Sequence, residues 1–243
     1  MIQQFEFVLQ SARMITPRVR ELAFTRADGQ PVDYEAGQFI TLHIPHTEKV
    51  LRRSYSIATM PAEGEAIRIA AAEVDGGRAT GVLFGMQPGD KVSATGPFGR
   101  FVLRDDAPCR YVLIATGTGV TPFRAMLPEL ERRIDLEDFE VDLLLGVRGP
   151  DELLYGEEFL RVADKHPRFR FHASYSRRMP DAPNGREYQG YAQQHLDSLQ
   201  LNPQRDIVYL CGNPGMIDAA AADLQQRGFP IQNVRREKYV SSN

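Results

Sequence analysis

Cysteine is scarce in this chain, tryptophan is absent, and no hydrophobic run approaches the length of a membrane span. The two cysteines, Cys109 and Cys211, lie far apart in the sequence and are too few to hold an iron–sulfur cluster. No spacing of Cys and His resembles a zinc site, so we expect no metal. The first residues lack the basic and apolar regions of a signal peptide. These absences predict a cytoplasmic protein with reduced thiols and no membrane association.

Charge of one sign is not in excess either. The formal net charge is −3, with 25% charged and 42% hydrophobic residues, which is the composition of a soluble globular protein. A general nucleic-acid binder would be strongly basic, so we expect no nucleic-acid partner. The 243 residues suffice for two domains of ordinary size. Since no sequence feature indicates assembly, we expect a monomer.

The first part of the chain, residues 1–104, predicts a six-stranded antiparallel barrel. Short segments with apolar and polar alternation are separated by Gly, Pro and Asp turns, a pattern typical of such barrels. Gly96-Pro97 is predicted to end the last of these strands. The six segments cover residues 5–9, 19–24, 38–44, 52–57, 66–72 and 91–94.

One of these strands carries residues that suit a ligand. In Arg53-Ser54-Tyr55-Ser56, alternation puts Arg53 and Tyr55 on one face. A guanidinium offers a forked set of donors to a phosphate, and a tyrosine offers a flat ring with a polar tip. A flavin nucleotide has a phosphate at one end and an aromatic system at the other, so it would use both. The alternative is an exposed strand whose arginines are solvated.

A short helix is predicted after Gly76-Gly77. Backbone N–H groups at a helix start favour an anion, and Thr80 adds a hydroxyl donor there. Gly77 and Thr80 thus mark a second place for the same phosphates. The alternative is a loop with a short surface helix.

The second part, residues 109–243, predicts an open parallel sheet with helices, joined to the first part through residues 105–108. Short apolar runs, typical of strands buried on both faces, alternate with helical segments. The strand-like runs cover residues 111–115, 141–146, 169–175 and 207–211, of which the first is continuously apolar. The helices cover 122–133, 157–165 and 214–224.

The turn Gly117-Thr118-Gly119-Val120-Thr121-Pro122 follows the first apolar run at once. A strand, a glycine turn and a helix start bring backbone N–H groups close to a dinucleotide pyrophosphate. Pro122 suits the first turn of that helix. The pattern is G-x-G-x-x-P rather than the common G-x-G-x-x-G, and a tight turn without a ligand is the alternative.

The ends of the later strands carry Arg and Ser where an NAD site commonly carries an acidic residue. Arg148 follows the second run, and Ser176 and Arg177 follow the third. Because Arg suits a 2′-phosphate by charge and geometry, these residues favour NADP over NAD; solvated loop cations are the alternative. Cys211 ends the last run. We expect it to pack against or position the nicotinamide rather than act as a nucleophile, because no motif places a His beside it.

With these motifs in this order, the chain resembles the ferredoxin–NADP(+) reductase family, in its bacterial flavodoxin/ferredoxin-type branch, over essentially its whole length. The resemblance implies a six-stranded antiparallel FAD-binding barrel at residues 1–104 and a five-stranded parallel α/β NADP(H)-binding domain at 109–243. It implies that Arg53 binds the FAD pyrophosphate, Tyr55 stacks on the isoalloxazine and Ser56 lies near the flavin N5. By the same resemblance the catalytic residues are Ser56, Tyr55 and Cys211, and the cofactor-binding residues are Arg53, Ser54, Tyr55, Ser56, Gly77, Thr80, Gly117, Thr118, Gly119, Thr121, Pro122, Arg148, Ser176, Arg177, Arg186 and Tyr239.

The activity that the resemblance implies is electron transfer between NADP(H) and a small ferredoxin or flavodoxin, with hydride transfer at the flavin N5. Because the chain carries no iron–sulfur motif, the one-electron carrier is expected to be another molecule. The alternatives are the reductase component of an oxygenase system, a free-flavin reductase, and a noncatalytic FAD-binding regulatory subunit, which often adds a cysteine-rich segment absent here. Many members of the family end at an aromatic residue, whereas residues 240–243 follow Tyr239. Either Tyr239 or this tail therefore covers the flavin or its adenine.

Overall fold

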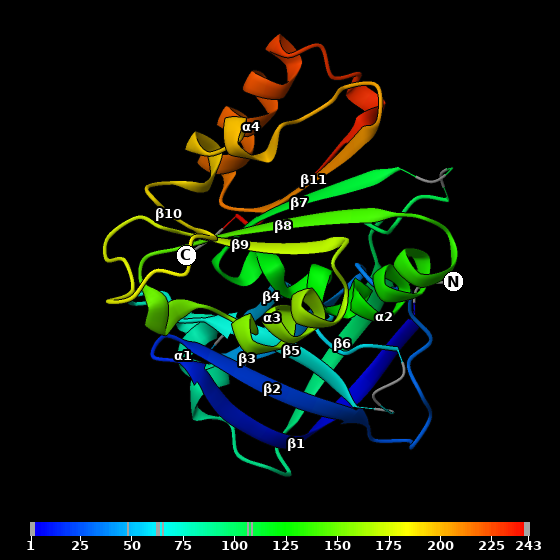
Figure 1. Cartoon of the computed structure of the whole chain (residues 1–243). Coiled ribbons are helices and arrows are strands. Elements are labelled where there is room, and N and C mark those ends of the chain that lie inside the picture. The colour runs from blue at the N-terminus through cyan, green and yellow to red at the C-terminus, as the bar shows by residue number, and fades with distance from the viewer. Residues whose placement is uncertain are drawn as a thin grey trace. The chain divides into compact units, whose positions relative to one another are not determined.

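The computed structural model describes residues 3–47, 49–61, 64, 66–105, 107 and 109–240. Asp106 and Pro108 of the predicted linker, and the tail 241–243, lie outside the described residues. The chain divides into two compact units. One is built from the chain up to Leu103 together with Thr121–Pro128, and the other from Arg104–Val120 and Glu129–Val240. Each unit holds one sheet (Figure 1).

The first unit contains the predicted six-stranded antiparallel sheet, in the order β4-β3-β6-β1-β2-β5. The prediction that Gly96-Pro97 ends the last strand is wrong. This strand, β6, continues to Phe98. Its pairing with β3 shifts register between Thr41 and Phe39, so the pairing resumes beyond the proline, with Phe98 opposite Phe39. The elements are β1 Gln3–Thr16, β2 Val19–Arg26, β3 Phe39–His46, β4 Lys49–Ser56, β5 Ile67–Ala72, the helix α1 Arg78–Gly85 and β6 Lys91–Phe98.

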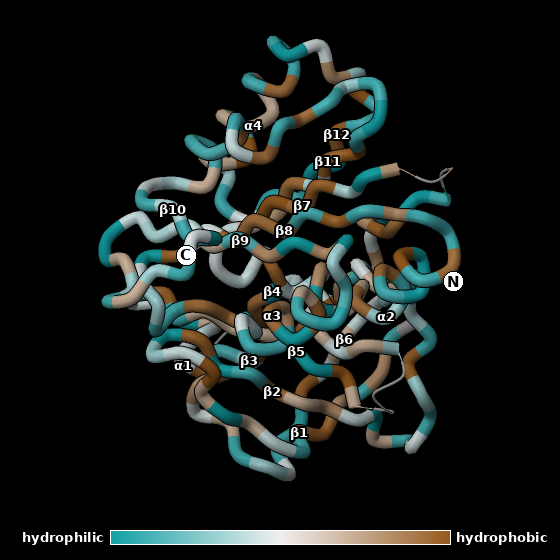
Figure 2. The backbone as a smooth tube through the Cα atoms, in the orientation of Figure 1, coloured by the Kyte–Doolittle hydropathy of each residue, from teal (hydrophilic) through white to brown (hydrophobic). Residues whose placement is uncertain are grey.

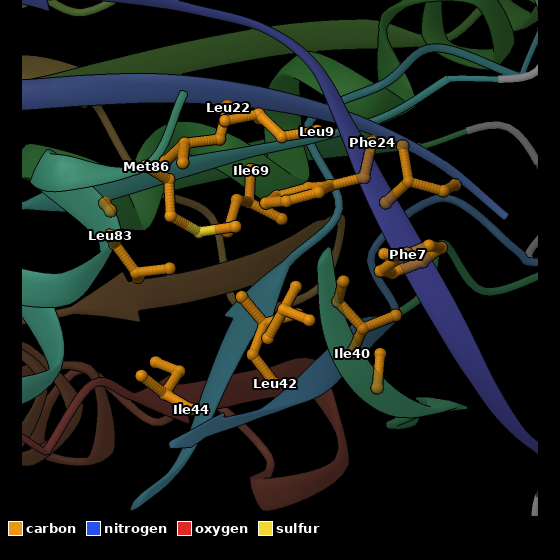
Figure 3. Packing of buried hydrophobic residues seen from close by; sticks show 14 of the residues in the cluster. Phe7, Leu9, Leu22, Phe24, Ile40, Leu42, Ile44, Ile69, Leu83 and Met86 are labelled. Atoms are coloured by element: carbon orange, nitrogen blue, oxygen red, sulfur yellow. The ribbon is translucent and has the colours of Figure 1, made fainter. Parts of the chain in front are cut away.

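Hydrogen bonds outside the strand ladders join the two edges of this sheet. Directly after β4, the Ala58 N–H donates to the Arg68 carbonyl of β5 at 2.8 Å. The Thr59 hydroxyl accepts from the Arg68 N–H at 2.6 Å. The sheet therefore closes around one core, to which all six strands contribute buried side chains (Figure 3).

The second unit holds the parallel sheet, in the order β10-β9-β8-β7-β11-β12. It has six strands, one more than expected. β10 has only three residues and β12 is mostly charged, so neither shows the apolar run of a buried strand. From Arg110 on, the strands and α-helices are β7 Arg110–Thr116, α2 Thr121–Leu136, β8 Glu140–Val147, α3 Gly156–Lys165, β9 Phe169–Tyr175, β10 Glu187–Gln189, β11 Asp206–Gly212, α4 Pro214–Gln226 and β12 Val234–Lys238.

The inner strands of the parallel sheet are buried on both faces, and Figure 2 shows β7, β8 and β11 as largely hydrophobic. On one face, Ile217 and Leu224 of α4 join the core formed by β7 and β11. On the other, Phe159 of α3 contacts Phe171 of β9, with ring centroids 5.4 Å apart. The chain proceeds from β7 to β8 on one side, whereas β11 lies on the other side of β7. Ligands of open parallel sheets bind where the strand order reverses in this way.

Candidate functional site

The loops after β7 and β11 lie against each other at this reversal of strand order. The Thr116 hydroxyl, at the end of β7, accepts a hydrogen bond from the Asn213 N–H at 2.8 Å. Two glycines permit the approach. A β-carbon on Gly119 would lie 2.7 Å from the Gly212 Cα, and one on Gly212 would lie 2.7 Å from the Thr116 carbonyl oxygen. No larger residue fits either position without moving backbone, so the two strand ends form one joined edge.

Gly117 differs from those two glycines because the space around it is open. Its φ is +51°, and no atom would lie within 4 Å of an added β-carbon. The turn continues through the 3-10 segment Gly117–Val120 into α2, where Thr121 and Pro122 are buried, while Thr118 is half-buried. Open backbone directly before a helix start is what a pyrophosphate requires. The predicted motif therefore has the geometry of a phosphate-binding turn.

The ends of β8 and β9 are joined by backbone hydrogen bonds. The Ser176 N–H donates to the Val147 carbonyl at 2.9 Å, and the Arg177 N–H donates to the Arg148 carbonyl at 3.0 Å. The side chains of Arg148 and Arg177 are exposed, and Ser176 is half-buried. The structure thus brings Arg148, Ser176 and Arg177 together at one edge of the sheet.

The backbone does not bring Arg186 to the same place. Its carbonyl accepts from the Ala173 N–H at 3.1 Å, so Arg186 lies beside the middle of β9, just before β10. Ser176 is three residues further along the chain than Ala173, which is about 10 Å at the rise of a β-strand.

Cys211 is fully buried near the end of β11, and its partner in β12 is Glu237. Burial raises the pKa of the Cys211 thiol well above its ordinary value; the charge of Glu237 adds to the rise, and a hydrogen bond with Tyr239 opposes it. The thiol therefore stays protonated at neutral pH, which favours a positioning role over a nucleophilic one. The Tyr239 N–H donates to the Gly212 carbonyl at 2.8 Å, so Tyr239 is held beside this strand end. Sequence reasoning did not single out Glu237, because its strand is mostly charged.

Arg53 and Tyr55 lie on one face of β4, as alternation predicts. Their partners across the ladder are Leu42 and Ile40, which are fully buried on the core side of β3. Arg53 and Tyr55 themselves are half-buried. Burial raises the pKa of Tyr55 to about 12, and the charge of Arg53 offsets this only in part. The strand thus presents a cation beside a neutral aromatic ring.

The two serines of the motif lie on the other face of β4. The Ser54 hydroxyl is 3.0 Å from that of Thr41 on β3, so it is engaged within the sheet. Ser56, at the end of the strand, is only 5% exposed. Ser56 is therefore held in a fixed position at the strand end.

The start of α1 lacks the groups that usually satisfy a helix N-terminus. Gly77 precedes the helix with extended backbone, no side chain caps it, and the first turn contains no acidic residue. Arg78, which is exposed, instead places a positive charge there. Thr80 is buried and donates its hydroxyl proton to the Gly77 carbonyl at 2.9 Å. Because a cation at the positive end of a helix is unfavourable without an anion, the first turn of α1 fits a phosphate.

The described residues therefore fit two ligands. The first unit offers a cation, a flat ring and a bare helix start, which suit a flavin nucleotide. The second offers an open glycine turn at the reversal of strand order, which suits a dinucleotide. Within the part of the chain that the structure describes, no group of three or more His, Cys, Asp and Glu residues is arranged to hold a metal ion. Among the same residues, no helix is long and apolar enough to cross a membrane.

Two family models match the chain, one for each set of residues. The oxidoreductase FAD-binding domain matches residues 6–103, which run from within β1 to beyond β6 and include the motif at Arg53. The oxidoreductase NAD-binding domain matches residues 113–222, which run from β7 into α4 and contain the glycine turn. The two matches agree with the two ligands that the geometry fits.

Two curated proteins that match nearly the whole chain are a reductase and the reductase component of an oxygenase. Ferredoxin–NADP reductase B of Sorangium cellulosum (strain So ce56) is 32% identical, over 98% of this chain and 98% of its own length. The reductase component DmpP of phenol 2-monooxygenase from Pseudomonas sp. (strain CF600) is 28% identical, over 99% of this chain and 67% of its own length.

Solved structures share the fold. The Amycolatopsis cytochrome P450 reductase GcoB superposes with a TM-score of 0.88 at 29% identity, covering 100% of this chain and 71% of its own. A ferredoxin NADP+ reductase from Neisseria gonorrhoeae, solved with bound FAD and NADP, gives a TM-score of 0.83 at 22% identity, covering 97% of this chain and 98% of its own.

Proposed function

Because the chain belongs to the ferredoxin–NADP(+) reductase family and is an FAD- and NAD(P)-binding oxidoreductase, we propose that it transfers electrons between NADP(H) and a small one-electron carrier, a ferredoxin or a flavodoxin. The observation that carries the proposal is the open backbone at Gly117, between strand ends that Gly119 and Gly212 allow to meet. It supplies a dinucleotide site in a chain whose other unit presents Arg53 beside Tyr55.

In the first unit, Arg53 and the start of α1 at Gly77 and Thr80 bind the FAD pyrophosphate. Tyr55 stacks on the isoalloxazine, and its pKa of about 12 keeps the phenol neutral against the ring. Ser56 orients its hydroxyl near the flavin N5. The flavin, when bound, supplies the exchange between a hydride and single electrons.

The turn Gly117–Pro122, which follows β7, binds the pyrophosphate of NADP(H). Arg148, Ser176 and Arg177 bind the 2′-phosphate, with Arg186 as an outlying contributor. At the other strand ends, the neutral Cys211 thiol positions the nicotinamide beside Glu237, and Tyr239 or the tail after it covers the flavin or its adenine.

The chain is organised as two cofactor-binding domains. The FAD-binding domain covers residues 1–104 and the NADP(H)-binding domain residues 109–243, with the linker between them. We propose a monomer in the cytoplasm, where Cys109 and Cys211 stay reduced.

A second candidate function is the reductase component of an oxygenase system. It is favoured by the 28% identity to the phenol 2-monooxygenase component and by the TM-score of 0.88 to GcoB. The chain matches 67% of the length of the former and 71% of the latter. Since its two cysteines are too few for an iron–sulfur cluster, a carrier of that kind lies outside these 243 residues in either case. The two candidates differ in which carrier accepts them.

An anaerobic titration of the purified, FAD-loaded chain with NADPH, and separately with NADH, tests the proposal. We expect the flavin absorbance to bleach at much lower NADPH than NADH, and the reduced protein then to reduce a ferredoxin or a flavodoxin. An equal response to both nucleotides would remove the NADP preference and leave the reductase function in place. No flavin absorbance after addition of FAD would overturn the whole proposal.

Replacement of Arg177 by alanine is expected to weaken NADPH binding by roughly 10- to 100-fold, because a hydrogen bond between charged groups contributes about 1.5–3 kcal/mol. NADH lacks the 2′-phosphate, so its affinity should not change. Arg161→Ala is the matched control, because Arg161 is an exposed arginine on α3, away from the strand ends. Dissociation constants from the titration above measure both. Equal losses for NADPH and NADH would contradict the role of Arg177.

A further inference from the structure

The C-terminal end of α1 is held by an arginine from another element. Arg20, on β2, donates from Nη1 to the Leu83 carbonyl at 2.9 Å and to the Phe84 carbonyl, and from Nη2 to the Met86 carbonyl at 2.9 Å. One guanidinium thus binds three carbonyls at the helix end, those of Leu83, Phe84 and Met86. Arg20 is itself half-buried, between neighbours Met14 and Ala71 in the sheet.

These bonds complete the hydrogen bonding of the helix end. The last carbonyls of a helix have no partner within it, and α1 has no basic residue in its own last turn. The Val82 carbonyl accepts from the Met86 N–H at 3.1 Å, and the Gly85 carbonyl accepts from Gln87 Nε2 at 3.3 Å. Arg20 supplies the donors for the two carbonyls between them. Its positive charge also lies at the negative end of the helix, where a cation is stabilising.

Apolar packing fixes the same end of α1. Leu83 is fully buried and Met86 is 6% exposed, and both belong to the barrel core (Figure 3). The opposite end, at Gly77 and Arg78, has neither a side-chain cap nor an acidic residue. Because α1 has only eight residues, fixing its C-terminal end also fixes the direction of its N-terminal turn.

The loop before α1 is tied to the same hairpin. Arg18, in the turn between β1 and β2, forms ion pairs with Glu73 at 3.2 Å and with Asp75 at 2.5 Å, and its carbonyl accepts from the Glu73 N–H at 2.8 Å. These two carboxylates precede the helix start, and their pairing with Arg18 reduces the negative charge that would repel a phosphate there. The pairs are exposed to solvent, so we expect Arg18 to contribute less than Arg20.

We propose that Arg20 is a positioning residue for the flavin nucleotide: by holding the C-terminal end of α1, it keeps the N-terminal turn in the orientation that binds the pyrophosphate. This inference rests on the proposed function, since that function supplies the ligand. Without Arg20 the helix would have to be ordered by FAD itself, and binding would be weaker by the free energy of that ordering.

The test compares FAD with riboflavin, which has the same isoalloxazine ring and no phosphate. Full-length wild type, Arg20→Ala, Arg20→Lys and Arg13→Ala are stripped of flavin and titrated with each ligand, with flavin fluorescence as the readout. We expect Arg20→Ala to weaken FAD binding by about tenfold, because the free energy of ordering the helix is then subtracted from the pyrophosphate contacts. Riboflavin makes no pyrophosphate contacts, so its binding should not change. Arg20→Lys keeps the charge but not the fork, so it should fall between wild type and Arg20→Ala.

Arg13→Ala is the matched control. Arg13 belongs to the same hairpin and its Nε pairs with Glu21 at 2.9 Å, so its removal disturbs the hairpin without touching α1. FAD affinity of Arg20→Ala within twofold of wild type, or an equal loss for riboflavin, would overturn the inference. If Arg20→Ala does not fold, the same comparison applies to Arg20→Lys. Wild type that binds no FAD would instead overturn the proposed function, so the two failures are distinguishable.

Discussion

Replacement of Arg110 by methionine is expected to lower the free energy of unfolding by about 3–5 kcal/mol, the range for removing one partner of a buried ion pair. Arg110 begins β7 and is 5% exposed. Its Nε donates to Asp206 at 3.0 Å and its Nη1 to Asp142 at 3.2 Å, and both carboxylates are almost fully buried. Methionine fills the volume but leaves these negative charges with fewer partners. Denaturant unfolding followed by circular dichroism measures the change.

Arg132→Met is the control for this substitution. Arg132 lies on α2 and is 46% exposed, and it pairs with Glu129 at 2.8 Å and Glu137 at 2.6 Å. Exposed pairs contribute about 1 kcal/mol or less, so this variant should stay close to wild type. Equal destabilisation by the two substitutions would contradict the importance of the buried network.

Acid should weaken the same network. Burial by itself raises the pKa of Asp142, but hydrogen bonds from Arg170 and His172 and the charges of Arg170 and Arg110 outweigh it and lower the pKa to about 2. An unfolded aspartate has a pKa of about 3.9. The stabilisation is therefore complete above about pH 4 and is lost as the pH falls toward 2. In Arg110→Met this acid-sensitive part of the stability should shrink.

Much of the fold could be predicted because its strands follow simple patterns. Alternation and turn residues indicated all six barrel strands, apolar runs indicated β7 and β11, and strand-like segments indicated β8 and β9. The helix predicted at residues 214–224 is α4, and the side chain of Asn213 caps it by accepting from the N–H groups of Gly215 and Met216. The two further edge strands had no such signal. β12, Val-Arg-Arg-Glu-Lys, is held by its register with β11 rather than by its own hydrophobicity.

The candidate site was predictable where chain order decides proximity. Parallel strands end at one edge, so Arg148 and Ser176 were expected to be neighbours, and their loops are hydrogen-bonded. The alternation of a single strand likewise placed Arg53 beside Tyr55. What the sequence does not encode locally is the support from distant segments. Arg20 and the helix end at Met86 are 66 residues apart, and no periodic pattern links an arginine on a strand to carbonyls that far along the chain.

The close approach of Gly119 to Gly212 at the reversal of strand order is likewise not encoded locally, because the two glycines are far apart in the sequence. Gly119→Ala is expected to lower kcat/KM for NADPH by about 100-fold, because a displacement of about 1 Å in a binding site has an effect of this size. Its β-carbon would meet the backbone of Cys211 and Gly212, so the ends of β7 and β11 must separate. The free energy of unfolding should fall by about 1–3 kcal/mol as well. Stopped-flow bleaching of the flavin by NADPH and denaturant unfolding measure the two effects.

Gly117→Ala should behave differently, because its β-carbon meets no atom of the chain. The left-handed φ of +51° adds strain of about 1–2 kcal/mol, and Gly228→Ala, at φ +83° and also in open space, carries the same strain away from the turn. We expect both to lower stability alike and only Gly117→Ala to raise the NADPH concentration needed for half-maximal bleaching. Since both variants add strain and only Gly117 lies in the turn, a shared effect on NADPH would mean that strain, and not a bound pyrophosphate, explains the result.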